Sequence, residues 1–235
     1  MKCKVMGIVN VTPDSFSDGG MYFRPEEAIR RAKNMVEEGA EIIDLGGEST
    51  RPGSTPIIWE EEWGRLEPVI MGLKGLVLSV DTYHPETAEK ALEAGVKIIN
   101  CVYAEPIPEM LKLLDKFPEA ELVLPTSCYD LNNSSLIAHS SSLIWDPMIG
   151  FGTERDEDLR LLRSTAEFKK MGRVLIGASR KRIVKKLTGE KVTGKNLGGN
   201  LGIAIWCAIK GADIVRVHDV KETVQALKVV EALEG

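Results

Sequence analysis

Short runs of apolar, largely β-branched residues alternate along the chain with longer segments whose apolar positions recur with the period of a helix. The first four segments are residues 4–9, 25–38, 41–45 and 59–73, which follow the order strand, helix, strand, helix. The same pattern predicts further strands at residues 76–80, 97–100, 121–124, 143–145, 174–178 and 213–217. We therefore expect eight strands, each followed by a connection.

The ends of the predicted helices carry the residues typical of helix starts and stops. Pro25 and Pro85 suit a first turn, and a glycine follows four helical runs, at Gly39, Gly95, Gly172 and Gly211. Parallel strands need crossover connections, and equal repeats can close on themselves. The pattern predicts one α/β domain over residues 1–235, a (β/α)₈ TIM barrel, with an open doubly wound sheet as the alternative.

Two connections depart from the repeat. Residues 129–142 are rich in Asn and Ser and barely long enough for a helix, so the fifth helix is expected to be short or missing. Residues 189–199 contain four glycines and predict a loop before a helix at 200–210.

Charge and composition narrow the class of protein. The formal net charge of −5 argues against nucleic acid or an anionic membrane as the main partner. No apolar run approaches the roughly 20 residues of a membrane helix, and the amino terminus lacks the pattern of a signal peptide, so we expect a cytoplasmic enzyme. The four cysteines are far apart, which predicts neither a zinc site nor a disulfide framework.

Polar residues follow seven of the eight predicted strands, where the active site of a parallel barrel lies. They are Asn10, Asp44 with the segment Glu48-Ser49-Thr50-Arg51, Asp81, Asn100, Asp146, the segment Ser179-Arg180-Lys181 and the segment Arg216-Val217-His218. A single Asp after a strand is more often a helix cap or an ion-pair partner, but occurrence at seven ends favours chemistry.

The side-chain types divide these residues into two groups. Carboxylates, an amide and a lysine can hydrogen-bond the edge of a flat heterocycle, and the candidates are Asp81, Asn100, Asp146 and Lys181. Guanidinium and imidazolium groups suit a phosphate, and the candidates are Arg51, Arg216 and His218. Residues 9–20 are Gly-rich and polar, which predicts a mobile lid or, alternatively, a surface loop.

Two long segments, M-G-I-V-N-V-T-P-D-S-F-S-D-G-G at 6–20 and I-D-L-G-G-E-S-T-R-P-G at 43–53, resemble the two signatures of dihydropteroate synthases. Five shorter segments follow in the order of that family: S-V-D-T at 79–82, I-I-N at 98–100, D-P-M-I-G-F-G at 146–152, G-A-S-R-K at 177–181 and R-V-H-D-V at 216–220. The resemblance covers nearly the whole chain.

The resemblance implies a transferase that joins a dihydropterin carrying a hydroxymethyl pyrophosphate to the amine of p-aminobenzoate and releases pyrophosphate, with Mg²⁺ bound to the pyrophosphate. The residues implied to hold the pterin are Asp81, Asn100, Asp146 and Lys181. Those implied to hold the pyrophosphate are Asn10, Arg51, Arg216 and His218, with Asn10 also contacting the metal. Those implied to border the aryl amine are Thr50, Pro52 and Phe151.

Several positions differ from the family pattern. Cys101 replaces the usual Asp after I-I-N, residues 124–128 replace a His-Met segment, and Met148 replaces a Gly. Arg182 stands where a small hydroxyl residue often borders the carboxylate of p-aminobenzoate. It suits a more anionic amine, such as the ribosylated aminobenzene phosphate of methanopterin synthesis; alternatively, Arg182 points to solvent.

Two other functions compete with the synthase. A pterin-dependent methyltransferase shares the barrel and the pterin-binding acids, but it has no use for a pyrophosphate site, so the S-R-K and R-V-H segments favour the synthase. A non-catalytic pterin-binding protein would accommodate the altered fifth strand and Cys101. A homodimer is expected by analogy with the family alone.

Overall fold

The eight strands close into a parallel barrel in chain order, as the sequence predicted. The computed structural model describes residues 2–12, 24–49, 54–130, 132–192 and 194–234. The strands are β1 (Lys4–Asn10), β2 (Ile42–Gly46), β3 (Leu78–Asp81), β4 (Ile98–Asn100), β5 (Glu121–Pro125), β6 (Leu143–Asp146), β7 (Arg173–Ile176) and β8 (Ile214–Val217). Pairing of β1 with β8 closes the barrel.

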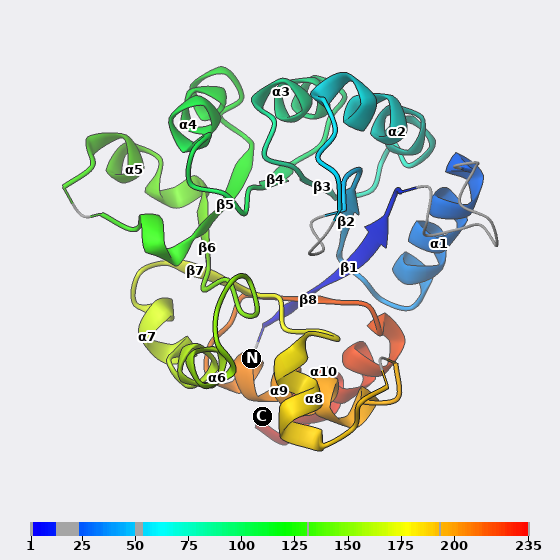
Figure 1. Ribbon diagram of the computed structural model, residues 1–235, viewed down its shortest axis with the longest axis vertical. Helices are drawn as coiled ribbons and strands as arrows, with labels where there is room; N and C mark the ends of the chain where they lie inside the picture. Colours follow the sequence, from blue (N-terminus) through cyan, green and yellow to red (C-terminus); the bar gives the residue numbers. More distant parts are fainter. Residues whose placement is uncertain (1, 13–23, 50–53, 131, 193, 235) are drawn as a thin grey trace.

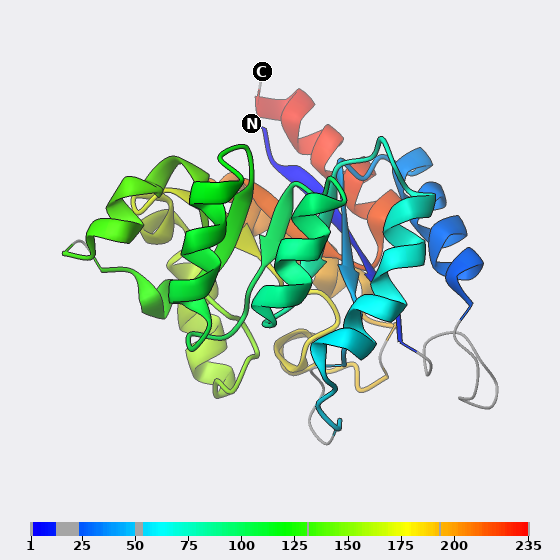
Figure 2. The ribbon, with the colours of Figure 1, turned by 90° about the horizontal axis from the view of Figure 1, so that it is seen from above.

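The helices surround this barrel (Figure 1). They are α1 (Pro25–Glu37), α2 (Trp59–Gly72), α3 (Pro85–Glu93), α4 (Ile107–Lys116), α5 (Ser134–Ala138), α6 (Arg155–Arg163), α7 (Thr165–Lys169), α8 (Arg182–Thr188), α9 (Leu197–Ile209) and α10 (Val220–Glu234). The start of β1 and the end of α10 lie close together in both views (Figures 1 and 2). None of the helices in the described ranges is both long and apolar enough to cross a membrane.

The barrel interior begins with an apolar layer. Seven buried side chains, one from every strand except β3, pack against one another: Met6, Ile42, Ile98, Val123, Ile144, Leu175 and Ile214. A larger apolar cluster fills the space between the outer faces of the strands and the helices. Both faces of most strands are thus buried, which explains why their sequences are continuous apolar runs.

The predicted helix ends are confirmed. Pro25 and Pro85 occupy the first turns of α1 and α3. All four predicted cap glycines have a positive φ, and at Gly39 (φ 106°) an added Cβ would also lie 3.0 Å from Val224 Cγ1. Glycine adopts this backbone conformation without the steric penalty of a side chain, so each helix turns directly into the next strand.

The two irregular connections had different outcomes. The fifth helix is short, as predicted, because α5 has five residues. The loop expected over 189–199 was wrong at its end, since α9 begins at Leu197 and includes Gly198 and Gly199. An added Cβ at Gly199 would lie 2.3 Å from Thr188 Cγ2 of α8, so this glycine allows close packing of α8 on α9.

Candidate active site

A polar layer lies directly above the apolar layer inside the barrel. Strand side chains alternate between faces, so residues two apart point the same way. Four strands that contribute an inward isoleucine place a polar residue two positions later: Asp44 in β2, Asn100 in β4, Asp146 in β6 and Arg216 in β8. The carboxyl end of the barrel is therefore lined with charge above an apolar floor.

Arg216 joins two of the acidic residues. Its Nε donates to Asp44 Oδ2 and its Nη2 to Asp81 Oδ2, both at 2.6 Å. Burial alone would lower the pKa of Arg216, but Asp44 and Asp81 raise it by more, so the guanidinium stays charged. Asp44 is fully buried within β2, and Arg216 lies within β8, so the expectation that these two residues follow their strands was wrong.

The role of Asp44 as a partner of Arg216 was missed by sequence reasoning. The signal was a single carboxylate in the middle of the otherwise apolar strand I-I-D-L-G. A buried charge needs a partner, because transfer of an isolated ion into the protein interior is costly. Such a residue therefore predicts an opposite charge on a neighbouring strand.

Asp81, Asp146 and Lys181 form the second part of the polar layer. Burial raises the pKa of Asp81 to about 7, against the opposing effect of Arg216. Burial also raises the pKa of Asp146 and lowers that of Lys181, while the attraction between these two groups opposes both shifts. Burial thus shifts all three pKa values in the direction that favours the neutral side chain, and such shifts are typical of functional sites.

The loop after β6 holds Lys181. Lys181 Nζ donates to the carbonyl of Ile149 at 2.5 Å and lies 5.8 Å from the ring centroid of Phe151. The loop itself is fixed because the Met148 amide donates to Asp146 Oδ1 at 2.7 Å. Met148 has φ 61°, a left-handed conformation that favours glycine, which is the residue that the family resemblance gives for this position.

Three buried polar atoms of this region have no hydrogen-bond partner among the described residues: Asn100 Oδ1, Asp44 Oδ1 and Ser79 Oγ. Leaving a buried acceptor unpaired is costly, so such an atom at the mouth of a barrel suits a ligand that donates a hydrogen bond. Asn10 ends β1 beside this region. A Cβ added at Gly46 would lie 3.9 Å from both Asn10 Oδ1 and Asp81 Cβ.

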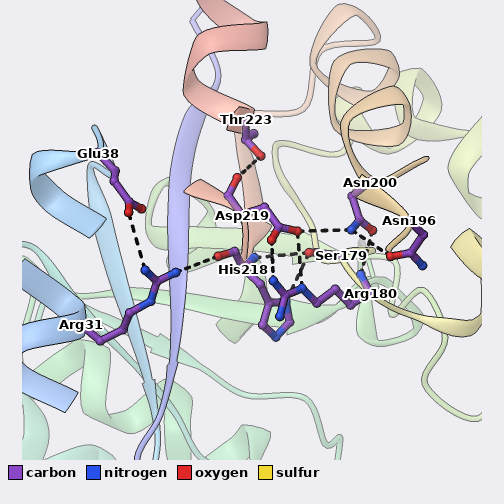
Figure 3. A network of polar contacts seen from close by, with 9 residues as sticks. All are labelled: Arg31, Glu38, Ser179, Arg180, Asn196, Asn200, His218, Asp219 and Thr223. Atoms are coloured by element: carbon purple, nitrogen blue, oxygen red, sulfur yellow. Dashed lines mark hydrogen bonds and ion pairs between the residues drawn. The ribbon is translucent and has the colours of Figure 1, made fainter. Parts of the chain in front are cut away.

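His218 follows β8 and contacts the loop after β7. Its Nδ1 and its backbone amide lie 3.2 and 3.3 Å from Ser179 Oγ, and its carbonyl accepts from Arg31 Nη2 at 3.2 Å (Figure 3). Ser179 thus positions the imidazole. His218 directly follows β8, two residues after Arg216, and so lies on the same barrel mouth.

The other predicted site residues differ in placement. Arg182 is the exposed first residue of α8, directly after Lys181. Thr50, Arg51 and Pro52 lie outside the described residues, as do residues 13–20 of the expected lid. Cys101 is buried, and burial raises the pKa of its thiol to about 12, which agrees with a space-filling side chain and not a nucleophile.

Comparison with known proteins identifies the family. The family model described as pterin binding enzyme matches residues 6–137 and 132–218. Dihydropteroate synthase of Bacillus subtilis (strain 168) is 38% identical over 258 residues, which cover 99% of this chain and 89% of the relative. The chain belongs to the dihydropteroate synthase family. The Neisseria meningitidis serogroup B synthase is 37% identical, with coverage of 99% and 93%.

Solved structures of dihydropteroate synthases share the fold. The Xanthomonas albilineans synthase with 4-aminobenzoic acid has a TM-score of 0.89 and 36% identity, with 100% of this chain and 94% of that chain covered. The same enzyme in complex with 7,8-dihydropteroate has a TM-score of 0.86, 34% identity and the same coverage. The family resemblance and the barrel predicted from the sequence are both confirmed.

Proposed function

We propose that this chain condenses 6-hydroxymethyl-7,8-dihydropterin pyrophosphate with p-aminobenzoate or a related aryl amine and releases pyrophosphate. One observation carries the proposal. A buried to partly buried group of acids, an amide and a lysine lies on the same barrel mouth as Arg216 and His218, in a chain of the dihydropteroate synthase family. The first group suits the pterin, and the second suits the pyrophosphate.

The pterin end is formed by Asp81, Asn100, Asp146 and Lys181. Carboxylate and amide oxygens accept hydrogen bonds from ring N–H and amino groups, and the lysine donates to a ring oxygen or nitrogen. The unpaired Asn100 Oδ1 supplies one such acceptor. Asn100 and Asp146 are buried, and Asp81 and Lys181 are partly buried, so hydrogen bonds to the ring would replace hydrogen bonds to water that these groups lose on folding.

The anion end is formed by Arg216 and His218, with Arg51 assigned to it by family resemblance. In the reaction the bond between the pterin methylene carbon and the pyrophosphate oxygen breaks, and its electron pair leaves with the pyrophosphate. The lone pair of the amine bonds to the same carbon, and the nitrogen then loses a proton. Cations preorganised at the leaving group, and carboxylates near the carbon, stabilise the charges that develop.

The donor set fits a Mg²⁺ ion that is held mainly by the substrate. The described residues contain no cluster of three or more His, Cys, Asp or Glu side chains that would hold a metal. Asn10 offers a hard oxygen ligand at the end of β1, and Mg²⁺ is commonly held by one or two protein oxygens together with phosphates and water. When bound, Mg²⁺ would neutralise charge on the leaving pyrophosphate.

The aryl amine would lie beyond the pterin, near Phe151, with Thr50 and Pro52 assigned there by resemblance. Arg182 is exposed and adjacent to Lys181, so it is accessible to a negatively charged substituent on the amine. This leaves two substrates to compare, p-aminobenzoate and its ribosyl phosphate derivative. We propose p-aminobenzoate, because the 4-aminobenzoic acid complex belongs to a synthase that is 36% identical to this chain.

The test is a mass-resolved assay with the dihydropterin pyrophosphate, Mg²⁺ and either amine. We expect dihydropteroate and one equivalent of pyrophosphate with p-aminobenzoate. Faster product formation with the ribosyl phosphate derivative would change the amine but keep the reaction. Pterin binding without product from either amine would contradict the synthase and favour a methyltransferase or a binding protein.

A further inference from the structure

An ion pair outside the polar layer joins the loops that follow β7 and β8. Arg180 Nη2 donates to Asp219 Oδ1 at 2.5 Å, and Arg180 Nε donates to Asp219 Oδ2 at 3.4 Å (Figure 3). Arg180 directly precedes Lys181, and Asp219 directly follows His218. The pair thus connects the neighbour of a pterin-end residue to the neighbour of an anion-end residue.

Asn200 of α9 binds both partners of this ion pair. Its Oδ1 accepts from the backbone amide of Arg180 at 2.9 Å, and its Nδ2 donates to Asp219 Oδ2 at 3.3 Å. The Asn200 side chain is buried, with 8% of the residue exposed. A buried amide that uses both its donor and its acceptor fixes the two loops relative to the helix.

The backbone at Arg180 supports the same role. Arg180 has φ 61°, and the amide of Lys181 donates to the carbonyl of Ala178 at 3.2 Å, which closes a tight turn. A residue with a Cβ is disfavoured in this conformation and persists there only where its surroundings hold it. Here the Arg180 side chain and backbone are both held, so the turn that carries Lys181 has one defined geometry.

The other end of the ion pair is anchored to α10. The carbonyl of Asp219 accepts from Thr223 Oγ1 at 2.7 Å and from the Thr223 amide at 3.2 Å (Figure 3). Thr223 is buried. Asp219 therefore cannot move without disturbing the first turn of α10, and the position of His218 follows from that of Asp219.

We propose that Arg180, Asp219 and Asn200 form a positioning clamp that sets the separation between Lys181 and His218. The inference rests on the proposed function, because a fixed separation matters only to a ligand that spans both ends of the site. Such a ligand gains affinity from the second end once the first is bound, provided that the geometry allows both contacts at once. None of the three clamp residues needs to touch the substrate.

The test compares one spanning ligand with its two halves. Calorimetry measures the affinity of wild-type protein for the dihydropterin pyrophosphate, for the dihydropterin alcohol that lacks pyrophosphate, and for pyrophosphate with Mg²⁺. Arg180→Met removes the ion pair and keeps an unbranched side chain at the same φ. The matched control is Arg173→Met, because Arg173 makes a similar two-point pair with Glu121 (2.5 and 3.1 Å) at the opposite barrel end and has comparable exposure.

We expect Arg180→Met to weaken binding of the spanning ligand by roughly 10- to 100-fold and binding of each half by less than about 3-fold, because misplacement by about 1 Å is enough for such a loss. KM for the pterin substrate should rise more than KM for the amine. Arg180→Lys should give an intermediate loss. Arg180→Gly removes both the pair and the strained side chain, so it should keep the fold and still show the loss.

The outcomes distinguish failure of the clamp from failure of the proposed function. Equal losses for the spanning ligand and its halves, or the same losses in Arg173→Met, would overturn the clamp and leave the synthase intact. A wild-type protein that binds the spanning ligand more tightly than either half but forms no product would contradict the synthase. The clamp would still be supported in that case if Arg180→Met removed the tighter binding of the spanning ligand. Failure of the wild-type protein to bind any of the three ligands would overturn both.

Discussion

An arginine pairs with carboxylate at each end of the barrel, but the surroundings of the two pairs differ. At the amino end, Arg173 of β7 binds Glu121 of β5, and about a third of each side chain is exposed, at 31% and 33%. At the carboxyl end, Arg216 binds Asp44 and Asp81, whose side chains are 0% and 17% exposed. The first pair lies in contact with water, and the second is almost enclosed.

This difference in exposure indicates which of the two pairs serves stability and which serves function. An exposed pair is screened by water and contributes about 0.2–1 kcal/mol. A buried pair recovers its desolvation cost poorly, so apolar side chains in its place would often be as stable. Charge kept inside the carboxyl end of a parallel barrel is therefore better explained by a polar ligand than by folding, in agreement with the usual location of active sites in this fold.

The largest difference between the two ends should follow removal of the arginines. Arg216→Met leaves Asp44 and Asp81 without their counter-charge, so we expect a loss of about 3–5 kcal/mol in the free energy of unfolding. Turnover should also fall by about 10²-fold or more. Arg173→Met should cost about 1 kcal/mol or less and leave turnover unchanged. Urea denaturation measures the stability and the product assay measures turnover. Equal losses for the two variants would show that the two ends of the barrel do not differ in function.

Asp81 at the carboxyl end should also make the stability of the protein depend on pH. Its pKa in the folded protein is raised by burial to about 7 from an ordinary value of 3.8. Between these values the unfolded chain loses a proton that the folded chain keeps, so this residue makes stability fall as pH rises from about 4 to about 7.

Asp81→Asn removes this titration. We expect the stability of the variant relative to wild type to increase over that pH range and to level off above it, by about 1.4 kcal/mol for each unit that separates the two pKa values. Thermal unfolding between pH 4 and 8 measures the effect. A stability difference that is constant across this range would show that Asp81 titrates normally. Turnover should fall in the same variant, because the neutral amide of Asn accepts hydrogen bonds from the ring more weakly than a carboxylate does.

Thr82→Val should have a smaller effect, because the Thr82 hydroxyl bonds Glu62 of α2 and is not one of the groups assigned to the substrate. Thr82 Oγ1 donates to Oε2 of the fully buried Glu62 at 2.6 Å. Valine leaves that carboxyl oxygen without this donor, which should cost about 1–3 kcal/mol in stability. Thr188→Val is the control, since Thr188 is exposed and, among the described residues, its hydroxyl bonds to Val184 of its own helix and to the nearby Glu190 amide; we expect it to change stability by about 0.5 kcal/mol or less. Equal effects of the two would show that the buried hydrogen bond from Thr82 to Glu62 does not contribute the expected stability.

Lys169→Met should have the smallest effect. Lys169 Nζ binds both oxygens of Asp213 (2.7 and 2.8 Å) near the amino end of the barrel, and both side chains are partly exposed. Asp213 Oδ2 also accepts from the Val174 amide, so it is not left without a partner. We expect a loss of about 1 kcal/mol or less, reduced further by salt. A loss above that of Thr82→Val would contradict the ranking of these interactions by exposure.

The fold was predictable because its signals are local and repeated. Strand periodicity, cap residues such as Gly39 and the shortened fifth unit each act within a few neighbouring residues. The start of α9 was not predictable, since Gly198 and Gly199 weaken a helix in isolation and are accepted because Gly199 allows contact with α8. That reason depends on packing between segments and is invisible to a local pattern.

The residues of the candidate site could be predicted from the sequence, but the contacts that these residues make with one another could not. Asp81, Asn100, Asp146, Lys181 and Arg216 do meet at one barrel mouth, because parallel strands bring their carboxyl ends together. The partnership of Arg216 with Asp44 depends on the register across three strands, which no single segment specifies. The contact of His218 with Ser179 and the clamp around Arg180 likewise depend on how successive loops pack.

The most direct test of the central claim is a crystal structure of this chain with 7,8-dihydropteroate. We expect the pterin ring to lie inside the carboxyl end of the barrel, with its polar edge in hydrogen-bond contact with Asp81, Asn100 and Asp146. We also expect the aryl group to extend past Lys181 toward Phe151. A ligand bound elsewhere, or a pterin that contacts none of the three polar residues, would contradict the assignment of this charged layer as the active site.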